Sequence, residues 1–358
     1  MDEYYNEFHS YLFNKIKDKN KINFAIGQPD FKPPKEMLKA IKDNIEINTG
    51  YIDPEGLPEL RELIKNKLRK ENKIKTEKII VTNGAIEAIF DSMLSHLKKD
   101  SEVILFSPYY CKYSTAPKII GAKIKKIQMK NKRPNISSLE KIINKKTRMI
   151  VLNNPCNPTG IVFSRDEINY LVELVEKNNL IMIADEVYEK YIYDRKKHIS
   201  PGRFSDKIIT INSFSKSFGF PGLRLGYLAG SSDLINPIIN VHMSNTTCSP
   251  YMFQKAAIAA LKYKKYPFDL SKYDKRRKKI IKILNENNID YIYPEGAFYF
   301  YLYTKKDSIK LSKKLLDNNV LVMHNKIFGD NKNAIRISYA VNDDKLKLGL
   351  KVLINLIK

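Results

Sequence analysis

The chain has 358 residues, which is enough to bury a sizeable core and to divide into two domains. Hydrophobic residues make up 43% of it and charged residues 28%, as in ordinary globular proteins, and no apolar run approaches the roughly 18–20 residues that cross a bilayer. The formal net charge of +24 suggests nucleic-acid binding, but lysine is scattered along the whole length, so we interpret the charge as a solvated surface and expect no membrane partner and no specific nucleic-acid partner.

Residues 1–21 are polar and charged, and they contain no apolar signal core before a small-residue cleavage site. We therefore expect a cytoplasmic protein. The cysteines, Cys111, Cys156 and Cys248, form no CxxC pair and match no metal-ligand spacing. An odd number of cysteines in a cytosolic chain indicates reduced thiols, and we predict no metal site.

Short apolar runs rich in Ile and Val alternate with helical segments through the middle of the chain. The runs predict strands over 78–82, 102–106, 123–127, 149–152, 180–184, 208–211 and 225–229. Helices are predicted between them over 85–98, 137–144 and 165–177. Most of the runs are apolar throughout, as in parallel strands that are buried on both faces. The pattern predicts a doubly wound α/β domain over residues 47–250.

The last third has a different pattern. Helices are predicted over 251–261, 273–287, 309–318 and 343–357, and strands over 297–303, 320–323 and 334–339. We interpret the basic block 275–279 as the solvated face of its helix. Together the two parts predict an α/β protein: a large domain with a mostly parallel seven-stranded sheet covered by helices, and a smaller α+β domain built from both chain ends, residues 1–46 and 251–358.

Lys216 lies between small hydroxyl residues in the run SFSKSFG, just past the apolar strand that ends at Ile211. Arg224 follows eight residues later, on or beside the next predicted strand. An amine that can form a Schiff base, close to a fixed cation that can hold a phosphate, suits a phosphorylated aldehyde cofactor.

Two further segments follow predicted strands. The loop NNPCNPTG, residues 153–160, lies where open α/β sheets place ligands, although a mere sharp turn is the alternative. Asp185 ends the strand 180–184, and its charge would need a fixed partner such as a protonated ring nitrogen. Tyr188 could place a phenol near the same ring. The alternative for Asp185 is a simple helix N-cap.

The segment TNGAIEA, residues 82–88, joins a strand to a helix with Gly84 at the junction. Backbone N–H groups at such a helix start can bind an anion. Neither GxGxxG nor GxxxxGK[ST] occurs in the chain, which disfavours a dinucleotide or nucleoside-triphosphate site.

Together these motifs resemble the fold-type I pyridoxal-phosphate enzymes, specifically the class I/II aminotransferases of the aspartate aminotransferase superfamily. The resemblance covers nearly the whole chain, in the expected order. Its motifs are IGQPDF (26–31), YIDPEGLPELR (51–61), TNGAIEA, SPYY (107–110), NNPCNPTG, DEVY (185–188), SFSKSFGFPGLRLGY (213–227), PEGAFY (294–299) and IRIS (335–338).

The resemblance implies the cofactor pyridoxal 5'-phosphate and roles for the residues around its ring. Lys216 would form the Schiff base and move the substrate's α-proton, and Asp185 would keep the ring nitrogen protonated. Asn157 and Tyr188 would contact the ring 3-oxygen. Tyr110 would stack on the ring, although core packing is its alternative.

The resemblance also implies how the phosphate and the substrate are held. The phosphate would be bound by the backbone of Gly84, Ala85 and Ile86 and by the side chains of Ser213, Ser215 and Arg224. Tyr51 would reach the phosphate of a neighbouring subunit, which implies a homodimer with shared active sites. Arg336 would clamp the substrate α-carboxylate, helped by Asn157 and the backbone of Gly27. The alternatives are serines that only satisfy nearby backbone groups and a surface arginine on an edge strand.

The chain departs from the family pattern at residues 324–329, HNKIFG, where a proline and a glycine are missing before Phe328. This loop commonly lies near the substrate side chain. Lys326 could pair with an acidic substrate, with a solvated lysine as the alternative, and we expect His324 to be structural.

The resemblance predicts an aminotransferase that moves an amino group between an amino acid and a 2-oxo acid by a ping-pong mechanism. A pyridoxal-phosphate-dependent decarboxylase or carbon–sulfur lyase of the same fold is the alternative. A nucleic-acid-binding regulator with an aminotransferase body is less favoured, because the family motifs begin by residue 26. Dicarboxylate, aromatic and branched substrates all remain open.

Overall fold

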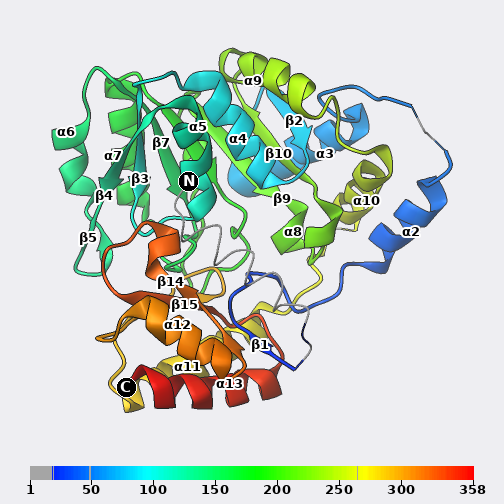
Figure 1. Ribbon diagram of the computed structural model, residues 1–358. Coiled ribbons are helices and arrows are strands. Elements are labelled where there is room, and N and C mark those ends of the chain that lie inside the picture. Colours follow the sequence, from blue (N-terminus) through cyan, green and yellow to red (C-terminus); the bar gives the residue numbers. More distant parts are fainter. Residues whose placement is uncertain (1–17, 19, 48–49, 264) are drawn as a thin grey trace.

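The computed structural model describes residues 18, 20–47, 50–263 and 265–358. Most of the N-terminal segment 1–21, and with it part of the predicted 1–46 contribution to the small domain, therefore lies outside the described residues. Figure 1 shows a large upper part built around one twisted sheet and a smaller lower part that carries the C-terminal helices. No described helix is both long enough and apolar enough to cross a membrane.

The large sheet has seven strands in the order β2-β10-β9-β8-β7-β3-β4. The strands are β2 (Lys78–Thr82), β3 (Glu102–Phe106), β4 (Lys123–Ile127), β7 (Thr147–Asn153), β8 (Ile181–Asp185), β9 (Ile208–Ser213) and β10 (Gly226–Gly230). β10 runs antiparallel to both of its neighbours, and the other pairings are parallel. The prediction of a mostly parallel seven-stranded sheet in an α/β protein is confirmed.

Successive residues of these strands point to opposite faces of the sheet and pack in different hydrophobic cores, which explains why the sequence shows unbroken apolar runs. In β8, Met182 packs in one core with Leu171 of α7, and Ile183 packs in another with Ile89 of α4. Helices therefore cover both faces. One face carries α4 (Ala85–His96), α5 (Thr115–Ile120) and α9 (Ser232–Asn245), and the other carries α7 (Arg165–Lys177).

The flank of the sheet beside β2 is covered by α2 (Lys35–Asn44), α3 (Pro58–Lys67) and α10 (Tyr251–Lys262). Ala256 and Ala257 of α10 share a core with Met37 of α2 and Val81 of β2. The domain boundary at residue 250 stays a prediction. The helix just beyond it packs with the large sheet.

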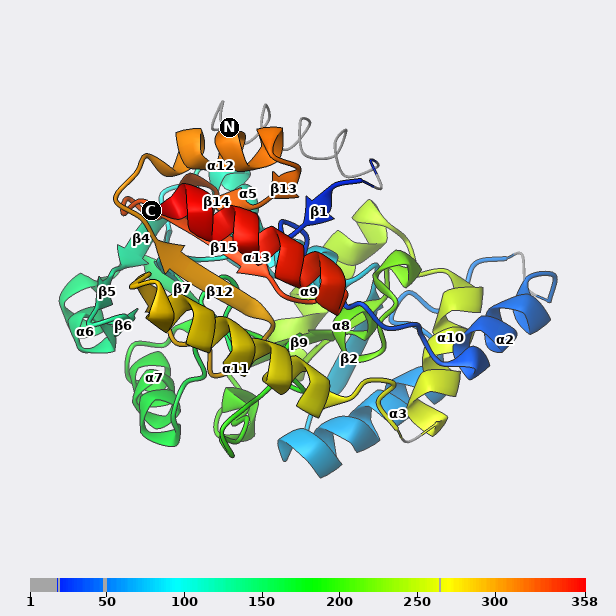
Figure 2. The ribbon, with the colours of Figure 1, turned by 90° about the horizontal axis from the view of Figure 1, so that it is seen from below.

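The smaller part contains an antiparallel sheet in the order β11-β12-β15-β14. Its strands are β11 (Tyr291–Ile292), β12 (Tyr299–Tyr303), β14 (Met323–His324) and β15 (Ala334–Ser338). Its helices, seen from below in Figure 2, are α11 (Leu270–Glu286), α12 (Ser308–Asp317) and α13 (Asp343–Ile357). β1 (Ile22–Asn23) pairs in parallel with β13 (Val320–Leu321), so the start of the described chain joins this part.

Several shorter elements complete the fold. They are the π-helix η1 (Leu68–Asn72), the 3-10 helices η2 (Cys111–Ser114), η3 (Ile136–Ser138), η4 (Pro201–Arg203), η5 (Pro221–Leu223) and η6 (Asn325–Phe328), the helices α6 (Leu139–Ile142) and α8 (Phe214–Ser217), and the hairpin β5 (Met129–Lys130) with β6 (Arg133–Pro134). The predicted helix 137–144 is thus a 3-10 turn followed by α6, which ends where Ile143 becomes extended.

The interpretation of block 275–279 as a solvated helix face is wrong for two of its residues. Arg276 is 4% exposed and Arg277 is fully buried. The guanidinium of Arg277 pairs with Asp194 at 2.6 Å and with Asp274 at 2.7 Å, which satisfies its charge inside the protein.

Candidate active site

A cavity of about 270 Å³ lies at the carboxyl ends of β7, β8 and β9, between the large sheet and the smaller one. Parallel strands end at the same edge of a sheet, so Asn153, Asp185 and Ser213 line it together. Among its lining residues are the predicted site residues Gly27, Ala85, Ile86, Tyr110, Asn157, Asp185, Tyr188, Ser213, Ser215, Lys216, Arg224 and Arg336. Gly84 packs against Arg224 but does not itself line the cavity, and neither does Tyr51.

Lys216 is held at the short helix α8, which begins after Ser213. The Ser213 hydroxyl oxygen accepts a 3.2 Å hydrogen bond from the backbone N–H of Ser215, and this fixes the start of the helix. The Nζ atom of Lys216 donates a 2.6 Å hydrogen bond to the carbonyl of Gly27. Burial, with the positive charges of Arg336 and Arg224, lowers the pKa of Lys216 to about 8. The amine is thus closer to its neutral, nucleophilic form than an exposed lysine.

Asp185 is the last residue of β8 and is almost fully buried. Burial raises the pKa of its carboxyl to about 6, against the effect of the hydrogen bonds that it accepts. The Tyr113 hydroxyl donates to Oδ2 at 2.6 Å, and the Val187 N–H donates to Oδ1 at 3.2 Å. A turn over residues 187–190 follows, not a helix, so Asp185 is no helix N-cap.

Tyr188 and Asn157 approach the cavity from neighbouring strand ends. The hydroxyl of Tyr188 lies 2.7 Å from that of Tyr299, and burial together with this neighbour raises the pKa of Tyr188 well above its ordinary value. Asn157 is placed by its own N–H, which donates to Oδ1 of Asn153 at 2.7 Å. Its side-chain oxygen accepts a 2.9 Å hydrogen bond from Arg336.

One end of the cavity is built to receive an anion. α4 begins after its N-cap residue Gly84, which has a φ of +89° and, as a glycine, has no side chain to cap the first N–H groups of the helix. A Cβ atom at Gly84 would lie 2.7 Å from Nη2 of Arg224, so the guanidinium is packed against this turn. Arg224 precedes β10 and has a φ of +50°, and its two nitrogens are held by the carbonyls of Pro221 and Asn83. The N–H groups at the start of a helix, a guanidinium and serine hydroxyls together favour a phosphate.

Arg336 lies on β15, which pairs with β12 on one side and β14 on the other. The alternative of a surface arginine on an edge strand is therefore wrong, and the residue is 4% exposed. Its guanidinium donates to Asn157 and to the carbonyl of Ala25, and it lies over the ring of Tyr299. Within the described residues its buried Nε has no hydrogen-bond partner. A buried guanidinium N–H without a protein acceptor is suited to bind a carboxylate ligand.

The remaining residues predicted from the sequence are Tyr110, Tyr51, Lys326 and His324. Tyr110 lines the cavity, with its ring edge-on to that of Tyr113 at 5.6 Å between centroids. Tyr51 is 88% exposed. Lys326, in η6, is exposed and does not line the cavity. His324 is buried, and burial lowers the pKa of its imidazole to about 4.

Sequence reasoning missed three residues of the site. Tyr299 contacts Tyr188, Tyr113 contacts Asp185, and the side chain of Asn153 links the ends of β7 and β8 through the carbonyl of Asp185 at 3.0 Å. Tyr299 ends the PEGAFY motif and Asn153 begins NNPCNPTG, so both stood within recognised motifs. Tyr113 gave no such signal beyond its place one helical turn after Tyr110.

Comparison with solved structures places this fold among known ones. A Pyrococcus protein described as protein-A1 matches with a TM-score of 0.92 at 33% identity, covering 98% of this chain and 95% of that one. A mutant of the Thermus thermophilus aspartate aminotransferase matches with a TM-score of 0.91 at 27% identity, covering 98% and 95%. The fold and its strand-end cavity therefore define an α/β enzyme of the aspartate aminotransferase type.

Sequence comparison gives the family. The family model for aminotransferase class I and II matches residues 19–353. A probable aspartate aminotransferase of Methanocaldococcus jannaschii is 37% identical over 96% of this chain and 94% of the relative, and an aspartate aminotransferase of Pyrococcus abyssi is 35% identical over 92% and 90%. The chain belongs to the class I and II aminotransferase family. It is an aminotransferase that transfers amino groups, and the family prediction is confirmed.

Proposed function

We propose that the cavity binds pyridoxal 5'-phosphate at Lys216 and transfers an amino group between an amino acid and a 2-oxo acid by a ping-pong mechanism. The observation that carries this proposal is the buried Nζ atom of Lys216, which lies in one cavity with a carboxylate and two guanidinium groups. A cytoplasmic location is part of the proposal.

The described residues fit this cofactor at both of its ends. The start of α4, Arg224 and the two serines would hold the phosphate, because they offer backbone N–H groups, a guanidinium and hydroxyl groups as donors to an anion. The buried carboxyl of Asp185 would hold a proton on the ring nitrogen. Tyr188 and Asn157 would contact the ring oxygen, and Tyr110 would cover a ring face.

When bound, pyridoxal phosphate supplies an aldehyde that condenses with amines and a protonated ring that draws electrons from a bond at the substrate Cα. Lys216 Nζ would carry the aldehyde in the resting enzyme and, once released by the substrate amine, would take the proton from the substrate Cα and deliver it to the aldehyde carbon. Its lowered pKa favours both roles, because only the neutral amine can attack a carbonyl carbon or accept a proton.

The substrate carboxylate would bind to Arg336, where the unpaired Nε is available. Asn157 orients the guanidinium from one side, and the segment from Ala25 to Gly27 borders it on the other. Because the amino donor and the oxo acceptor both carry an α-carboxylate, they would occupy the Arg336 site in turn, which supports a ping-pong order. A clamped carboxylate also favours transamination over decarboxylation, and it gives the lyase alternative no specific support.

We propose a homodimer with shared active sites. Tyr51 is 88% exposed and does not line the cavity of its own subunit, and it follows the exposed apolar residues Ile45 and Ile47 in the sequence. A second copy that covers this surface would allow Tyr51 to reach the phosphate of the partner. Measurement of molecular mass by light scattering tests this assembly.

The names of the similar proteins make aspartate the first amino donor to test. The purified protein would be examined for the visible absorption band of a lysine-bound cofactor and then mixed with aspartate under single-turnover conditions. Conversion of the band to that of the amino form, and its return with a 2-oxo acid, supports the proposal. A bound cofactor that never reaches the amino form would favour a lyase or decarboxylase, and the absence of any band after reconstitution would defeat the cofactor assignment.

A further inference from the structure

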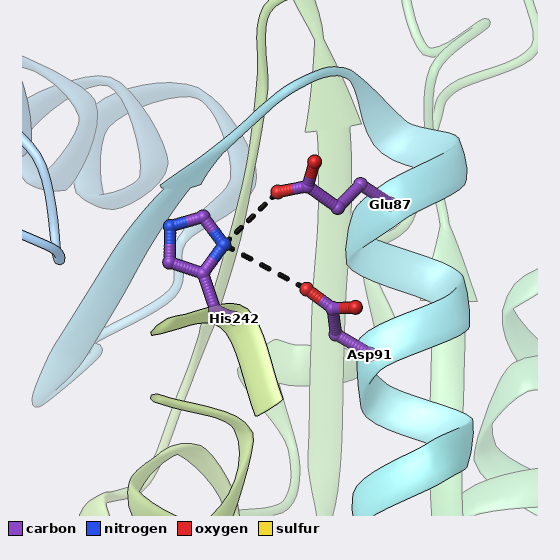
Figure 3. Close-up of side chains that lie close together, drawn as sticks. All are labelled: Glu87, Asp91 and His242. Carbon is purple, nitrogen blue, oxygen red and sulfur yellow. Dashed lines mark ion pairs between the residues drawn. The ribbon is translucent and has the colours of Figure 1, made fainter. Parts of the chain in front are cut away.

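A buried charged cluster lies behind the anion-binding end of the cavity. Glu87 and Asp91 lie one turn apart on α4, and His242 of α9 faces both of them (Figure 3). Nδ1 of His242 is 2.9 Å from Oε1 of Glu87 and 3.7 Å from Oδ2 of Asp91. His242 and Asp91 are fully buried. None of the three lines the cavity.

Two carboxylates on one buried helix face repel each other unless a cation lies between them. Among the described residues, His242 is the basic side chain that pairs with either carboxylate. Burial opposes its charge, but its contacts with Asp91 and Glu87 outweigh that effect and raise the pKa of His242 to about 9. Contact with His242, against the effect of burial, lowers the pKa of Glu87. At neutral pH the cluster therefore contains an imidazolium beside an ionised Glu87.

Glu87 is also bonded to the turn that would receive the phosphate. Its Oε1 accepts a 3.2 Å hydrogen bond from the backbone N–H of Asn83, and its Oε2 accepts one of 3.1 Å from Thr246. Asn83 directly precedes Gly84, and its carbonyl accepts from Nη2 of Arg224 at 3.5 Å. Glu87 thus fixes the backbone to which both the start of α4 and Arg224 are attached.

This position creates an electrostatic conflict. A carboxylate in the first turn of a helix is attracted to the positive helix end, which is the same end that a bound anion needs. An ionised Glu87 without a partner would weaken phosphate binding at that turn. The imidazolium of His242 neutralises the carboxylate and leaves its hydrogen bond to Asn83 in place.

We propose that His242 is a positioning residue for the phosphate of the cofactor, because it neutralises Glu87 and keeps that carboxylate bonded to the turn formed by residues 83–86. The proposal rests on the proposed cofactor site and adds to it a residue outside the cavity. It concerns the phosphate alone, so it leaves the reactions of Lys216 with the aldehyde unchanged.

The test compares the affinities of the full-length protein, freed of cofactor, for pyridoxal phosphate and for pyridoxal, which lacks the phosphate. In His242→Gln, Glu87 keeps its charge and loses its neutralising partner. We expect pyridoxal phosphate to bind about tenfold more weakly and pyridoxal to bind as before. Glu87→Gln keeps an oxygen acceptor for Asn83 without the charge, so E87Q should retain the preference for the phosphate. The double variant E87Q/H242Q should recover most of the loss seen in H242Q.

The outcomes distinguish failure of the positioning role of His242 from failure of the proposed cofactor site. An unchanged preference in H242Q, an equal loss for pyridoxal, or a loss in E87Q as large as that in H242Q would overturn the positioning role and leave the cofactor site standing. Failure of the unaltered protein to bind either compound would instead overturn the proposed function. Thermal unfolding of each variant checks the fold. If H242Q does not fold, His242→Asn, which also removes the imidazolium charge, takes its place in the same comparison.

Discussion

The hydroxyl of Tyr113 donates a 2.6 Å hydrogen bond to Oδ2 of Asp185, and both side chains are buried at the edge of the cavity. Burial raises the pKa of Asp185 to about 6, and this hydrogen bond opposes the rise. Tyr113 thus favours the carboxylate form in a place where burial favours the acid. A carboxylate is the form that can hold a proton on a ring nitrogen, so we assign Tyr113 an indirect part in the chemistry.

The first prediction concerns Tyr113→Phe. Loss of the hydrogen bond raises the pKa of Asp185 further, so the acid limb of the pH profile of kcat/KM should move up by about one unit, and kcat should fall. Tyr301→Phe is the matched control, because the Tyr301 hydroxyl donates to the buried carboxyl of Asp330 at 2.9 Å outside the cavity lining. A profile that does not move in Y113F, or that moves equally in Y301F, would count against this role.

The second prediction concerns Lys216→Ala. Without Nζ no amine can hold the aldehyde or move the Cα proton, so both the visible absorption band of the lysine-bound cofactor and turnover should be lost. Lys112→Ala is the matched control, because Lys112 also lines the cavity and K112A should keep the band. Retention of the band in K216A would refute the assignment of the cofactor lysine.

The sequence predicted the large sheet closely because its strands carry a strong local signal. The ranges 78–82, 102–106 and 123–127 coincide with β2, β3 and β4, and the continuous apolar residues in most of these runs follow from burial on both faces. The residues at strand ends were found for the same reason. A carboxylate at the end of a buried strand, such as Asp185, or a lysine shortly after one, such as Lys216, stands out against its apolar surroundings.

What the sequence could not give depends on contacts between distant segments. The run Ala256–Ala260 does not predict that α10 packs with α2, because small apolar residues could be buried equally well in the large or in the smaller part of the molecule. From the sequence, Arg277 is predicted to be a surface residue. Its burial depends on Asp194, which is far from it in the sequence and pairs with it in the fold. Tyr113 and Tyr299 are likewise two among 22 tyrosines until the fold places their hydroxyls on Asp185 and Tyr188.

The third prediction concerns Gly27, whose carbonyl accepts from Lys216. A Cβ atom at this position would lie 1.7 Å from the hydroxyl oxygen of Tyr299, so Gly27→Ala must move either residue 27 or the Tyr299 ring. Either shift disturbs the placement of Lys216 or the Tyr188–Tyr299 hydrogen bond, and we expect kcat to fall about 100-fold. Gly222→Ala is the control, because in the described part of the chain no atom beyond its direct neighbours lies within 4 Å of the added Cβ. Near-normal activity of G27A, measured in the same assay as G222A, would show that the contact has no catalytic importance.

The fourth prediction concerns Arg336→Lys. An ammonium keeps the charge but cannot contact Asn157, Ala25 and a carboxylate together, as the guanidinium fork can. We expect KM for amino acids to rise about 100-fold while the affinity for pyridoxal phosphate stays unchanged. An amine without a carboxylate provides an internal control, since its reaction with the bound cofactor should be the same in both proteins. An equal loss for that amine would mean that Arg336 acts on the cofactor and not on the substrate carboxylate.

The last prediction follows from the charges around Lys216. Its pKa is lowered to about 8, first by burial and then by Arg336 and Arg224. Only the neutral amine attacks an aldehyde, so attachment of pyridoxal phosphate to the cofactor-free protein should speed up as pH rises and level off about one unit above the pKa. Stopped-flow absorbance measures this rate directly.

Removal of one of the two cations separates their effect from that of burial. Without the charge of Arg336 the ammonium form of Lys216 is less disfavoured, so its pKa rises, and in Arg336→Gln the midpoint of the rate profile should move to higher pH by about half a unit or more. Arg148→Gln removes the same net charge from an exposed position outside the cavity lining and should leave the midpoint in place. A midpoint that is unmoved in R336Q would leave burial as the main cause of the low pKa. A midpoint that moves equally in R148Q would mean that the overall positive charge of the protein, and not the fixed guanidinium beside the amine, keeps Lys216 reactive.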